Sequence, residues 1–290
     1  MKLISQFVRE YLLAVQFFTR IPIAGRLADW VGFSPAMLRA SAAHFPGVGV
    51  LTGAAAASVY GLLMLLLPET PFSALAAAAL STVCTVMLTG AFHEDGLADV
   101  ADGLGGTHGT NQRERALDIM KDSRVGAFGA LALVLALLSK VALLALLGSI
   151  AGAASEDSDD SPLLTPPFIG WYACLALWLG HIVSRGLPLL LIYLLPHVGD
   201  TAASKSKPLA DQISLNRLML AFLWCFMALA AASLALDAMT LIVVCSFSVL
   251  ALLWMGRLFK RRLQGFTGDC LGATQQVCEI AFYLGLAVSL

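Results

Sequence analysis

Three aspartates stand at helical spacing within one short acidic stretch, residues 93–103, with the sequence HEDGLADVADG. Asp95, Asp99 and Asp102 occupy positions i, i+4 and i+7, so a helix would carry their carboxylates on one face. Like charges at this spacing repel one another, and Mg²⁺, which takes a few carboxylates together with substrate phosphate, would offset them. The stretch therefore predicts a metal site with catalysis. The alternative is an exposed acidic helix start at the end of an apolar span.

Cations and glycines near this stretch suit the phosphates of an anionic substrate. Lys121 and Arg124 precede the next apolar run, where they either bind phosphate or only orient the chain in a membrane. Gly103 belongs to a group of glycines that either approach a phosphate or end a helix. Arg185 lies inside an apolar run, where a charge is costly, and this favours phosphate binding over snorkelling to the interface.

A second polar cluster, residues 265–273 with the sequence GFTGDCLGA, precedes the last apolar run. Asp269 either joins the acidic site or caps a helix, and Thr267 either contacts substrate or serves as the N-cap. His44 precedes the first apolar run, as a substrate contact or as an interfacial histidine. Lys140 lies in the middle of an apolar run, and the sequence offers no evident partner for it.

The composition places these residues in a membrane protein. The 290 residues are 59% hydrophobic and 13% charged, with a mean hydropathy of +0.82. Soluble domains of this size cannot hide so much apolar surface. A net charge of −1 excludes a global field that would recruit nucleic acid. The six cysteines form no CxxC pair, so we expect packing residues rather than zinc ligands or a disulfide framework.

Apolar runs predict an all-α bundle of about seven transmembrane helices forming one integral-membrane domain, residues 1–290. The expected spans are residues 45–67, 71–92, 125–154, 168–195, 217–236, 239–255 and 271–290. Pro188 predicts a kink in the fourth span. Residues 1–44 lack the pattern of a signal peptide and are expected to form a cytoplasmic or interfacial segment, partly as an amphipathic helix.

Loop charges predict the orientation, because Lys and Arg are retained on the cytoplasmic side. Positive residues occur before the first span and in every second connection after it: Lys2, Arg9, Arg20, Arg26, Arg39, Arg113, Arg115, Lys121, Arg124, Lys205, Lys207, Arg257, Lys260, Arg261 and Arg262. The other connections, residues 68–70, 155–161 and the turn at Asp237, contain no Lys or Arg. We therefore expect an inner-membrane protein with its N-terminus and its polar motifs on the cytoplasmic side.

The order of these motifs resembles the cobalamin (5'-phosphate) synthase family, also called adenosylcobinamide-GDP ribazoletransferases. The resemblance runs along nearly the whole chain: QFFTRIP at 16–22, HFPGVG at 44–49, GAFHEDGLAD at 90–99 with DG at 102–103, MKDS at 120–123 and TGDCLGA at 267–273. The acidic connection 155–161 is longer than the family pattern leads us to expect.

The resemblance implies a Mg²⁺-dependent final step of cobalamin assembly, in which α-ribazole or its 5'-phosphate attacks adenosylcobinamide-GDP and displaces GMP. It implies metal binding by Glu94, Asp95, Asp99 and Asp102, and phosphate binding by Lys121 and Arg185. His93 or one of the acids, such as Asp102 or Asp269, would orient the attacking ribose hydroxyl. Positioning and electrostatics supply most of the catalysis in such a transfer.

Two other functions remain open on the residues alone. A CDP-alcohol phosphotransferase also gathers aspartates at a membrane face, but its D-G-x-x-A-R pattern is not met, since Asp99 follows Ala98. A transporter is suggested by Lys140 and Arg185, although transporters favour midplane charges and internal repeats. The preferred form of ribazole, the number of metal ions and any homo-oligomer are not predicted.

Overall fold

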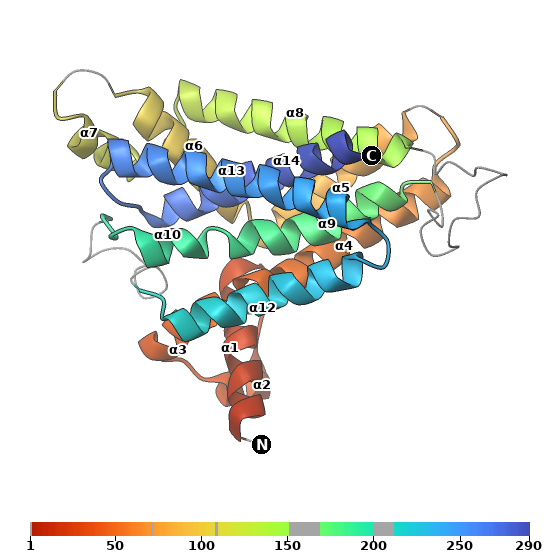
Figure 1. Ribbon diagram of the computed structural model, residues 1–290. Helices are drawn as coiled ribbons and strands as arrows, with labels where there is room; N and C mark the ends of the chain where they lie inside the picture. Colours follow the sequence, from red (N-terminus) through yellow and green to blue (C-terminus); the bar gives the residue numbers. More distant parts are fainter. Residues whose placement is uncertain (1, 71, 108–109, 151–168, 200–211) are drawn as a thin grey trace.

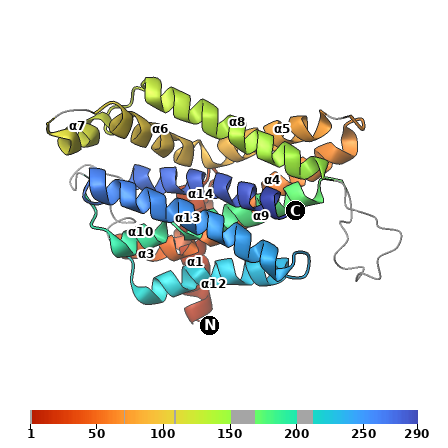
Figure 2. The same ribbon diagram turned by 45° about the horizontal axis from the view of Figure 1, so that its top comes forward.

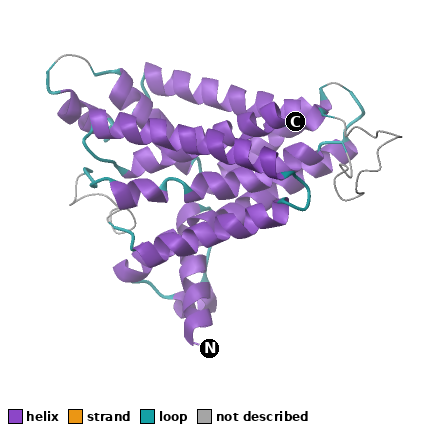
Figure 3. Cartoon of the chain, viewed as in Figure 1, coloured by secondary structure: helices purple, strands orange, loops and turns teal. Residues whose placement is uncertain are grey.

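The computed structural model describes residues 2–70, 72–107, 110–150, 169–199 and 212–290, and these residues form helices without a strand (Figure 3). In chain order the helices are α1 (Lys2–Phe18), α2 (Gly25–Val31), α3 (Pro35–Ser41), η1 (Ala42–His44), α4 (Phe45–Leu66), α5 (Ser73–Thr89), α6 (Phe92–Gly105), α7 (Gln112–Ile119), α8 (Ala127–Ser149), α9 (Trp171–Gly186), α10 (Leu189–Leu194), α12 (Leu215–Ala232), α13 (Ala238–Arg262) and α14 (Gly268–Ser289). The expected acidic connection 155–161 and Lys205 and Lys207 lie outside the described residues.

Six helical segments are long and apolar enough to cross a membrane: Pro35–Leu66, Ala127–Ser149, Trp171–Leu194, Leu215–Ala232, Ala238–Arg262 and Gly268–Ser289. A seventh crossing is possible where α5 and α6 form a pair bent by 90°. The prediction of an all-α polytopic membrane protein with about seven spans is confirmed. The predicted interruption at Pro188 is also confirmed, since α9 ends at Gly186 and α10 begins at Leu189.

The interior of the bundle is built on α9 and α14. Figures 1 and 2 show α8, α13, α14 and α9 running alongside one another, and α14 packs against α13, α6, α9 and α8. Within the segment α9–α10, 89% of the most apolar window is buried, against 17% for α8. The outer helix α8 instead exposes leucines such as Leu131, Leu135 and Leu138. Polar residues on α9 and α14 are therefore surrounded by protein, whereas α8 turns most of its surface to lipid.

A sharp bend separates α5 from the acidic helix α6. Gly90 and Ala91 both adopt left-handed backbone conformations, with φ values of 67° and 58°. A Cβ atom at Gly90 would also collide with the guanidinium of Arg20, which lies against this turn. Because of the bend, α6 leaves the direction of α5 and packs beside α8 and α14. The acidic residues thus lie after the turn rather than on the apolar helix that precedes them.

The N-terminal segment differs in part from its prediction. Helix α1 stands across the other helices, and its end marked N lies farthest from the bundle (Figure 1). The first spanning segment begins at Pro35 rather than at residue 45, because α3, η1 and α4 follow one another without an extended break. Residues Leu27, Trp30 and Phe33 are exposed. That residues 1–44 lie at the membrane interface, within a single domain 1–290, stays a prediction.

Candidate functional site

Four aspartates meet where α6 packs against the first turn of α14. The charge of Asp99 interacts with those of Asp269, Asp95 and Asp102, and Asp269 in turn interacts with Asp95. The two helices approach so closely that a Cβ atom at Gly96 would lie 2.8 Å from the backbone oxygen of Asp269. The structure therefore brings Asp269 beside the α6 acids, as the positive-inside argument leads us to expect.

Asp95, Asp99 and Asp269 form what we call the acid cluster. Asp95 is exposed, and the other two are half-buried. None of the three forms an ion pair with a described side chain, and Asp269 accepts a hydrogen bond of 3.3 Å from the hydroxyl of Thr267. Like charges left together without a described counter-charge create a strongly negative site.

Asp102 has a different role from its neighbours on α6. Its carboxylate is buried and accepts hydrogen bonds from the backbone N–H of Gly126, at 2.7 Å, and of Gly129, at 2.8 Å. These N–H groups belong to the start of α8, which lacks intrahelical acceptors for them. Both carboxylate oxygens are thus engaged in joining α6 to α8. This favours a structural role for Asp102 over the predicted metal ligand or catalytic acid.

Glu94 and His93 face the interior of the bundle rather than the acid cluster. Glu94 is 8% exposed and accepts a hydrogen bond of 3.1 Å from Gln276 Nε2, while its Oε2 has no described partner. His93 is 1% exposed and stacks on Phe45, with ring centroids 5.5 Å apart. The prediction that Glu94 ligates metal together with Asp95 conflicts with this placement, because consecutive helix residues point in directions about 100° apart.

Arg185 is buried at the end of α9, which excludes the snorkelling alternative. Its Nη1 lies 2.6 Å from His181 Nδ1 and donates to the backbone oxygen of His181 at 3.0 Å. The guanidinium stands 5.8 Å from the centre of the Phe45 ring, and its charge interacts with those of Glu94 and Glu279. Arg185 is therefore held by protein groups, which argues against the predicted direct contact with phosphate.

Glu279 on α14 is the centre of this buried polar network, and sequence analysis missed it. Its carboxylate binds Lys140 Nζ at 2.5 Å, Tyr283 Oη at 2.7 Å and Gln275 Nε2 at 2.5 Å. His181 Nε2 lies 3.7 Å away. Lys140 thus has a partner after all. A glutamate inside the last apolar run was the available signal, because an ionisable residue in a span is a functional or paired group by default.

The remaining predicted substrate residues pair with local acids or cap a helix. Arg124 is 87% exposed and pairs with Asp122, whose pKa its hydrogen bonds lower to about 2. Lys121 Nζ lies 3.9 Å from Asp118, and both side chains are exposed. Thr267 is the N-cap of α14 and accepts from Cys270 N–H. Its predicted substrate contact competes with that cap.

The structure places Gly103 and His44 in contacts between helices. Gly103 is buried against α7, where a Cβ atom would lie 2.9 Å from the backbone oxygen of Ala116, so it packs helices, and its contact with substrate stays a prediction. His44 is fully buried, with Phe7 against its ring at 4.6 Å and Glu10 Oε2 at 3.7 Å from Nε2. Glu10 is itself bound by Arg217 at 3.0 Å. His44 therefore belongs to the contact between α1 and α12, not to an open mouth.

The acid cluster fits a divalent cation only with help from a substrate. Among the described residues, no group of three or more His, Cys, Asp and Glu side chains converges as a metal-binding set. The three carboxylates are nevertheless close enough to interact. Mg²⁺ needs only one or two carboxylates when waters and substrate phosphates complete its six-oxygen shell. The residues present suit that arrangement and not a closed protein cage.

An apolar pocket lies next to the acid cluster. It is lined by residues of α1, α4, α6, α10 and α14, among them Phe17, Phe18, Phe45, Phe92, His93 and Leu271. Gly268, the residue before Asp269, also lines it. The site therefore combines a negative cluster, a buried polar network and an aromatic pocket within the same few helical turns.

Comparisons with known proteins agree on one family. The family model described as Cobalamin-5-phosphate synthase matches residues 10–287. A protein of Polaromonas sp. (strain JS666 / ATCC BAA-500) named adenosylcobinamide-GDP ribazoletransferase is 73% identical over 287 residues, covering 99% of each chain. Proteins with the same name from Albidiferax ferrireducens and Vibrio cholerae are 58% and 38% identical, over 99% and 94% of this chain and 100% and 91% of theirs. No solved structure matches the chain. By its motifs, its helical bundle and these relatives, the chain belongs to the cobalamin-5-phosphate synthase family.

Proposed function

We propose that this protein transfers the adenosylcobinamide phosphate group from adenosylcobinamide-GDP to α-ribazole or α-ribazole 5'-phosphate, with release of GMP. The observation that carries the proposal is the acid cluster, a negative site without an ion pair among the described residues, in a chain whose relatives bear the name of this reaction. The step completes the nucleotide loop of cobalamin. The enzyme is thus a transferase that works on a diphosphate.

The proposed reaction balances without an oxidant or reductant. A ribose hydroxyl oxygen of ribazole forms a bond to the phosphorus nearest cobinamide. The bond between that phosphorus and the bridging oxygen breaks, and GMP leaves with the electron pair. The hydroxyl proton passes to a base, for which a carboxylate of Asp99 or Asp269 is the nearest proposed acceptor. Orienting the hydroxyl against the phosphorus is the main task left to the protein.

Mg²⁺ is part of this proposal. Asp95, Asp99 and Asp269 would hold the ion, and when bound it would neutralise negative charge on the diphosphate oxygens. Without a cation, the acid cluster and the diphosphate would repel each other, so the same residues could not bind this substrate. Lys121 remains a proposed phosphate contact. Asp102, Glu94 and Arg185 support the site by fixing α6 and α9.

The protein is proposed to lie in the inner membrane, with the acid cluster on the cytoplasmic side. Basic residues Lys260, Arg261 and Arg262 occupy the last turn of α13, and Arg262 Nη2 donates to Leu104 O on α6 at 3.0 Å. The end of α6 and this basic turn are therefore at the same end of the bundle. Because basic residues are retained in the cytoplasm, this supports a cytoplasmic position for the acid cluster. A membrane-impermeant thiol reagent added outside should label Glu69→Cys but not Ser123→Cys. The reverse labelling would contradict this orientation.

The two competing functions receive less support. Lys140, one basis for a transporter, forms a buried ion pair with Glu279, and Arg185 is bound by His181. These charges hold helices together and do not need a transported ion to balance them. The CDP-alcohol phosphotransferase reading lacks its motif, and the family found here is a different one.

Release of GMP tests the proposal. The purified protein in detergent, with Mg²⁺, adenosylcobinamide-GDP and α-ribazole, should release one GMP for each nucleotide loop completed. Both products are measured by chromatography, so that hydrolysis of the diphosphate is distinguished from transfer. Asp237→Asn, an exposed cap of α13, provides a control that should retain full activity. Absence of GMP with the folded protein, or GMP without the joined product, would contradict the proposed transfer.

A further inference from the structure

Asp269 enters the acid cluster from a short connection between α13 and α14, residues 263–267. The other two members, Asp95 and Asp99, lie on α6 itself. Asp269 belongs to the first turn of α14, and its backbone lies close against Gly96 of α6. The first turn of a helix has the fewest intrahelical hydrogen bonds, so its position depends on the residues before it. The path of the connection therefore sets where Asp269 stands against the α6 acids.

The backbone of this connection is strained at Gln264, which has a left-handed conformation with a φ of 60°. Among the described residues, the other non-glycine residues with a positive φ are Ala91 and Asn111. Asparagine tolerates this conformation, whereas alanine and glutamine seldom adopt it. Ala91 is the residue before α6, so both helices that carry the acid cluster follow a strained residue. Such strain persists where neighbouring contacts impose it, and it is common at functional sites.

One such contact comes from the segment that follows α10. Phe266 is fully buried and donates its backbone N–H to Pro196 O at 3.0 Å. Its own backbone oxygen accepts from Val198 N–H at 2.9 Å. Next to it, a Cβ atom at Gly265 would collide with the backbone oxygen of Pro196 and with Cγ1 of Val198. Only glycine allows two backbones to approach so closely, and this bridge fixes the connection on one side.

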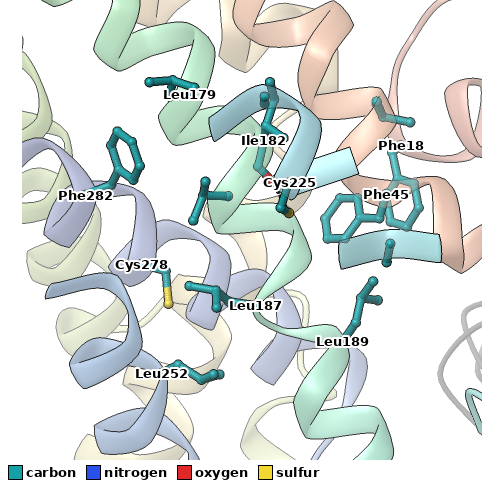
Figure 4. Packing of buried hydrophobic residues seen from close by; sticks show 14 of the residues in the cluster. Phe18, Phe45, Leu179, Ile182, Leu187, Leu189, Cys225, Leu252, Cys278 and Phe282 are labelled. Carbon is teal, nitrogen blue, oxygen red and sulfur yellow. Dashed lines mark hydrogen bonds between the residues drawn. The ribbon is translucent and has the colours of Figure 1, made fainter. Parts of the chain in front are cut away.

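The segment that forms the bridge is anchored in the core. Leu187 and Leu189, at the break between α9 and α10, are 6% and 2% exposed. Figure 4 draws both side chains together with Leu252 of α13 and Cys278 of α14, and all four belong to the hydrophobic core of the bundle. Residues 196–198 begin two positions after the end of α10. The bridge therefore ties the connection to a buried part of the bundle.

A second contact holds the connection from the side of α6 and α7. Arg113 of α7 donates its Nε–H to Leu263 O, the C-cap carbonyl of α13, at 2.8 Å. A cation is favourable at this end of a helix, where backbone carbonyls lack partners. Arg262 of α13 adds hydrogen bonds to Leu104 O at 3.0 Å and to Thr107 Oγ1 at 3.2 Å. The connection is thus held on both sides, by the α10 segment and by the end of the acid helix.

We propose that these two contacts position Asp269 against Asp95 and Asp99, which makes Gly265 and Arg113 positioning residues of the metal site; this assignment rests on the proposed function. Both residues act through the path of the connection and do not touch the substrate. A cation shared by several carboxylates needs their oxygens at fixed separations. A misplacement of about 1 Å caused by a distant change can cost roughly a hundredfold in rate, so these supporting contacts matter for catalysis.

Binding of Mn²⁺ in the presence of pyrophosphate, followed by electron paramagnetic resonance, tests the assignment without turnover. Gly265→Ala should bind the ion at least about tenfold more weakly than wild type, the usual loss when a residue that supports metal ligands is changed. Gly61→Ala is the matched control, because its Cβ would meet only Cys174 Sγ at an ordinary 3.5 Å, and it should bind like wild type. Equal affinity of folded Gly265→Ala and wild type would overturn the assignment.

Arg113→Ala removes the second contact and keeps the bridge, so it tests the assignment even if Gly265→Ala does not fold. Its affinity for Mn²⁺ should also fall, by a smaller factor, because the bridge still holds the connection. Arg115→Ala, at an exposed arginine of the same helix, is the matched control and should bind the ion like wild type. Unchanged affinity in Arg113→Ala would overturn the assignment.

A double variant separates the positioning of Asp269 from a general effect on the fold. In a protein that already carries Asp269→Ala, Gly265→Ala should weaken Mn²⁺ binding little further, because both changes remove the same ligand from its place. Losses that multiply would make Gly265 a packing residue only and would overturn the assignment. The expected binding pattern in a protein that releases no GMP would support the positioning and contradict only the proposed reaction.

Discussion

The bundle holds two groups of charged residues that differ in burial and in charge balance. Around Glu279, the network includes Lys140 and Arg185 as cations and Glu94 and Glu279 as anions, so its formal charges cancel within the protein. The acid cluster of Asp95, Asp99 and Asp269 forms no ion pair with a cation among the described residues. The buried network lies among interior helices, where unpaired charge is costly, while the cluster lies at their ends, where water and ligands reach it.

The difference separates stability from activity. The network should contribute mainly to helix assembly, because its groups bind one another. The acid cluster contributes repulsion to the folded protein, and proteins retain such strain chiefly at functional sites. Removing a charge from the acid cluster should therefore lower activity and spare stability, whereas removing a charge from the buried network should lower stability.

The largest effect is expected on activity when the acid cluster loses a charge. Asp99→Asn should lower kcat by at least about a hundredfold, the usual cost of removing one electrostatic contact in a transition state. Its thermal unfolding in detergent should shift upward or stay unchanged, because repulsion is relieved. Asp95→Asn should behave alike. Near-normal turnover of both variants at saturating Mg²⁺ would remove the acid cluster from the mechanism.

The largest effect on stability is expected at Glu279. Glu279→Gln leaves Lys140 without its anionic partner, and breaking a buried ion pair costs about 3–5 kcal/mol. Thermal unfolding followed by intrinsic fluorescence should show a large decrease in Tm. The double variant Glu279→Gln with Lys140→Met restores the charge balance and should recover most of the loss. If the single variant is as stable as wild type, the network does not hold the helices together.

Variants of Asp269 test whether this residue acts together with Asp99. Asp269→Ala should lower activity about as much as Asp99→Ala, and the double variant should be little worse than either, because residues that act as one unit are strongly non-additive. Thr267→Val removes the α14 cap and the hydrogen bond to Asp269 but keeps the charge of Asp269, so it separates the loss of the cap from the loss of the charge, at a cost of about 1 kcal/mol of stability. Losses that multiply in the double variant would make Asp269 part of the helix start only.

The smallest effect is expected at Arg124, which was predicted from sequence to bind phosphate. The pair with Asp122 is exposed, and exposed ion pairs contribute little to stability, so Arg124→Ala should leave Tm nearly unchanged and KM within about twofold of wild type. Steady-state kinetics with each substrate varied in turn provide the measurement. A large rise in the KM for adenosylcobinamide-GDP would return Arg124 to the substrate site and extend that site beyond the acid cluster.

The sequence was informative about helices and about which end of the bundle carries the polar motifs. Apolar runs and Pro188 predicted the spans, and the placing of basic loops predicted that Asp269 and Asp95 lie at the same end of the bundle despite their distance in the chain. These inferences depend on hydropathy and charge, which are local properties. They do not require knowledge of how one helix is rotated against the next.

Side-chain partners across helices could not be predicted in this way. Glu94 and Asp95 are neighbours in sequence, yet the packing of α14 against α6 places one inward and the other outward. Asp102 shares the predicted face of Asp95, but the start of α8 takes up its carboxylate. Lys140 and Glu279 pair only because α8 and α14 touch. The rotation of each helix and the identity of its neighbours depend on tertiary packing, which the spacing of residues within one helix does not reveal.

Binding of Mn²⁺, as a spectroscopic substitute for Mg²⁺, tests most directly whether the acid cluster holds the metal ion proposed for catalysis. The protein in detergent is titrated with Mn²⁺ in the presence of pyrophosphate, and free ion is followed by electron paramagnetic resonance. Wild type and the cap variant Asp237→Asn should bind the ion equally, whereas Asp95→Asn and Asp99→Asn should bind it at least about tenfold more weakly. Equal affinity in all four proteins would contradict the account, because the acid cluster would then hold no cation.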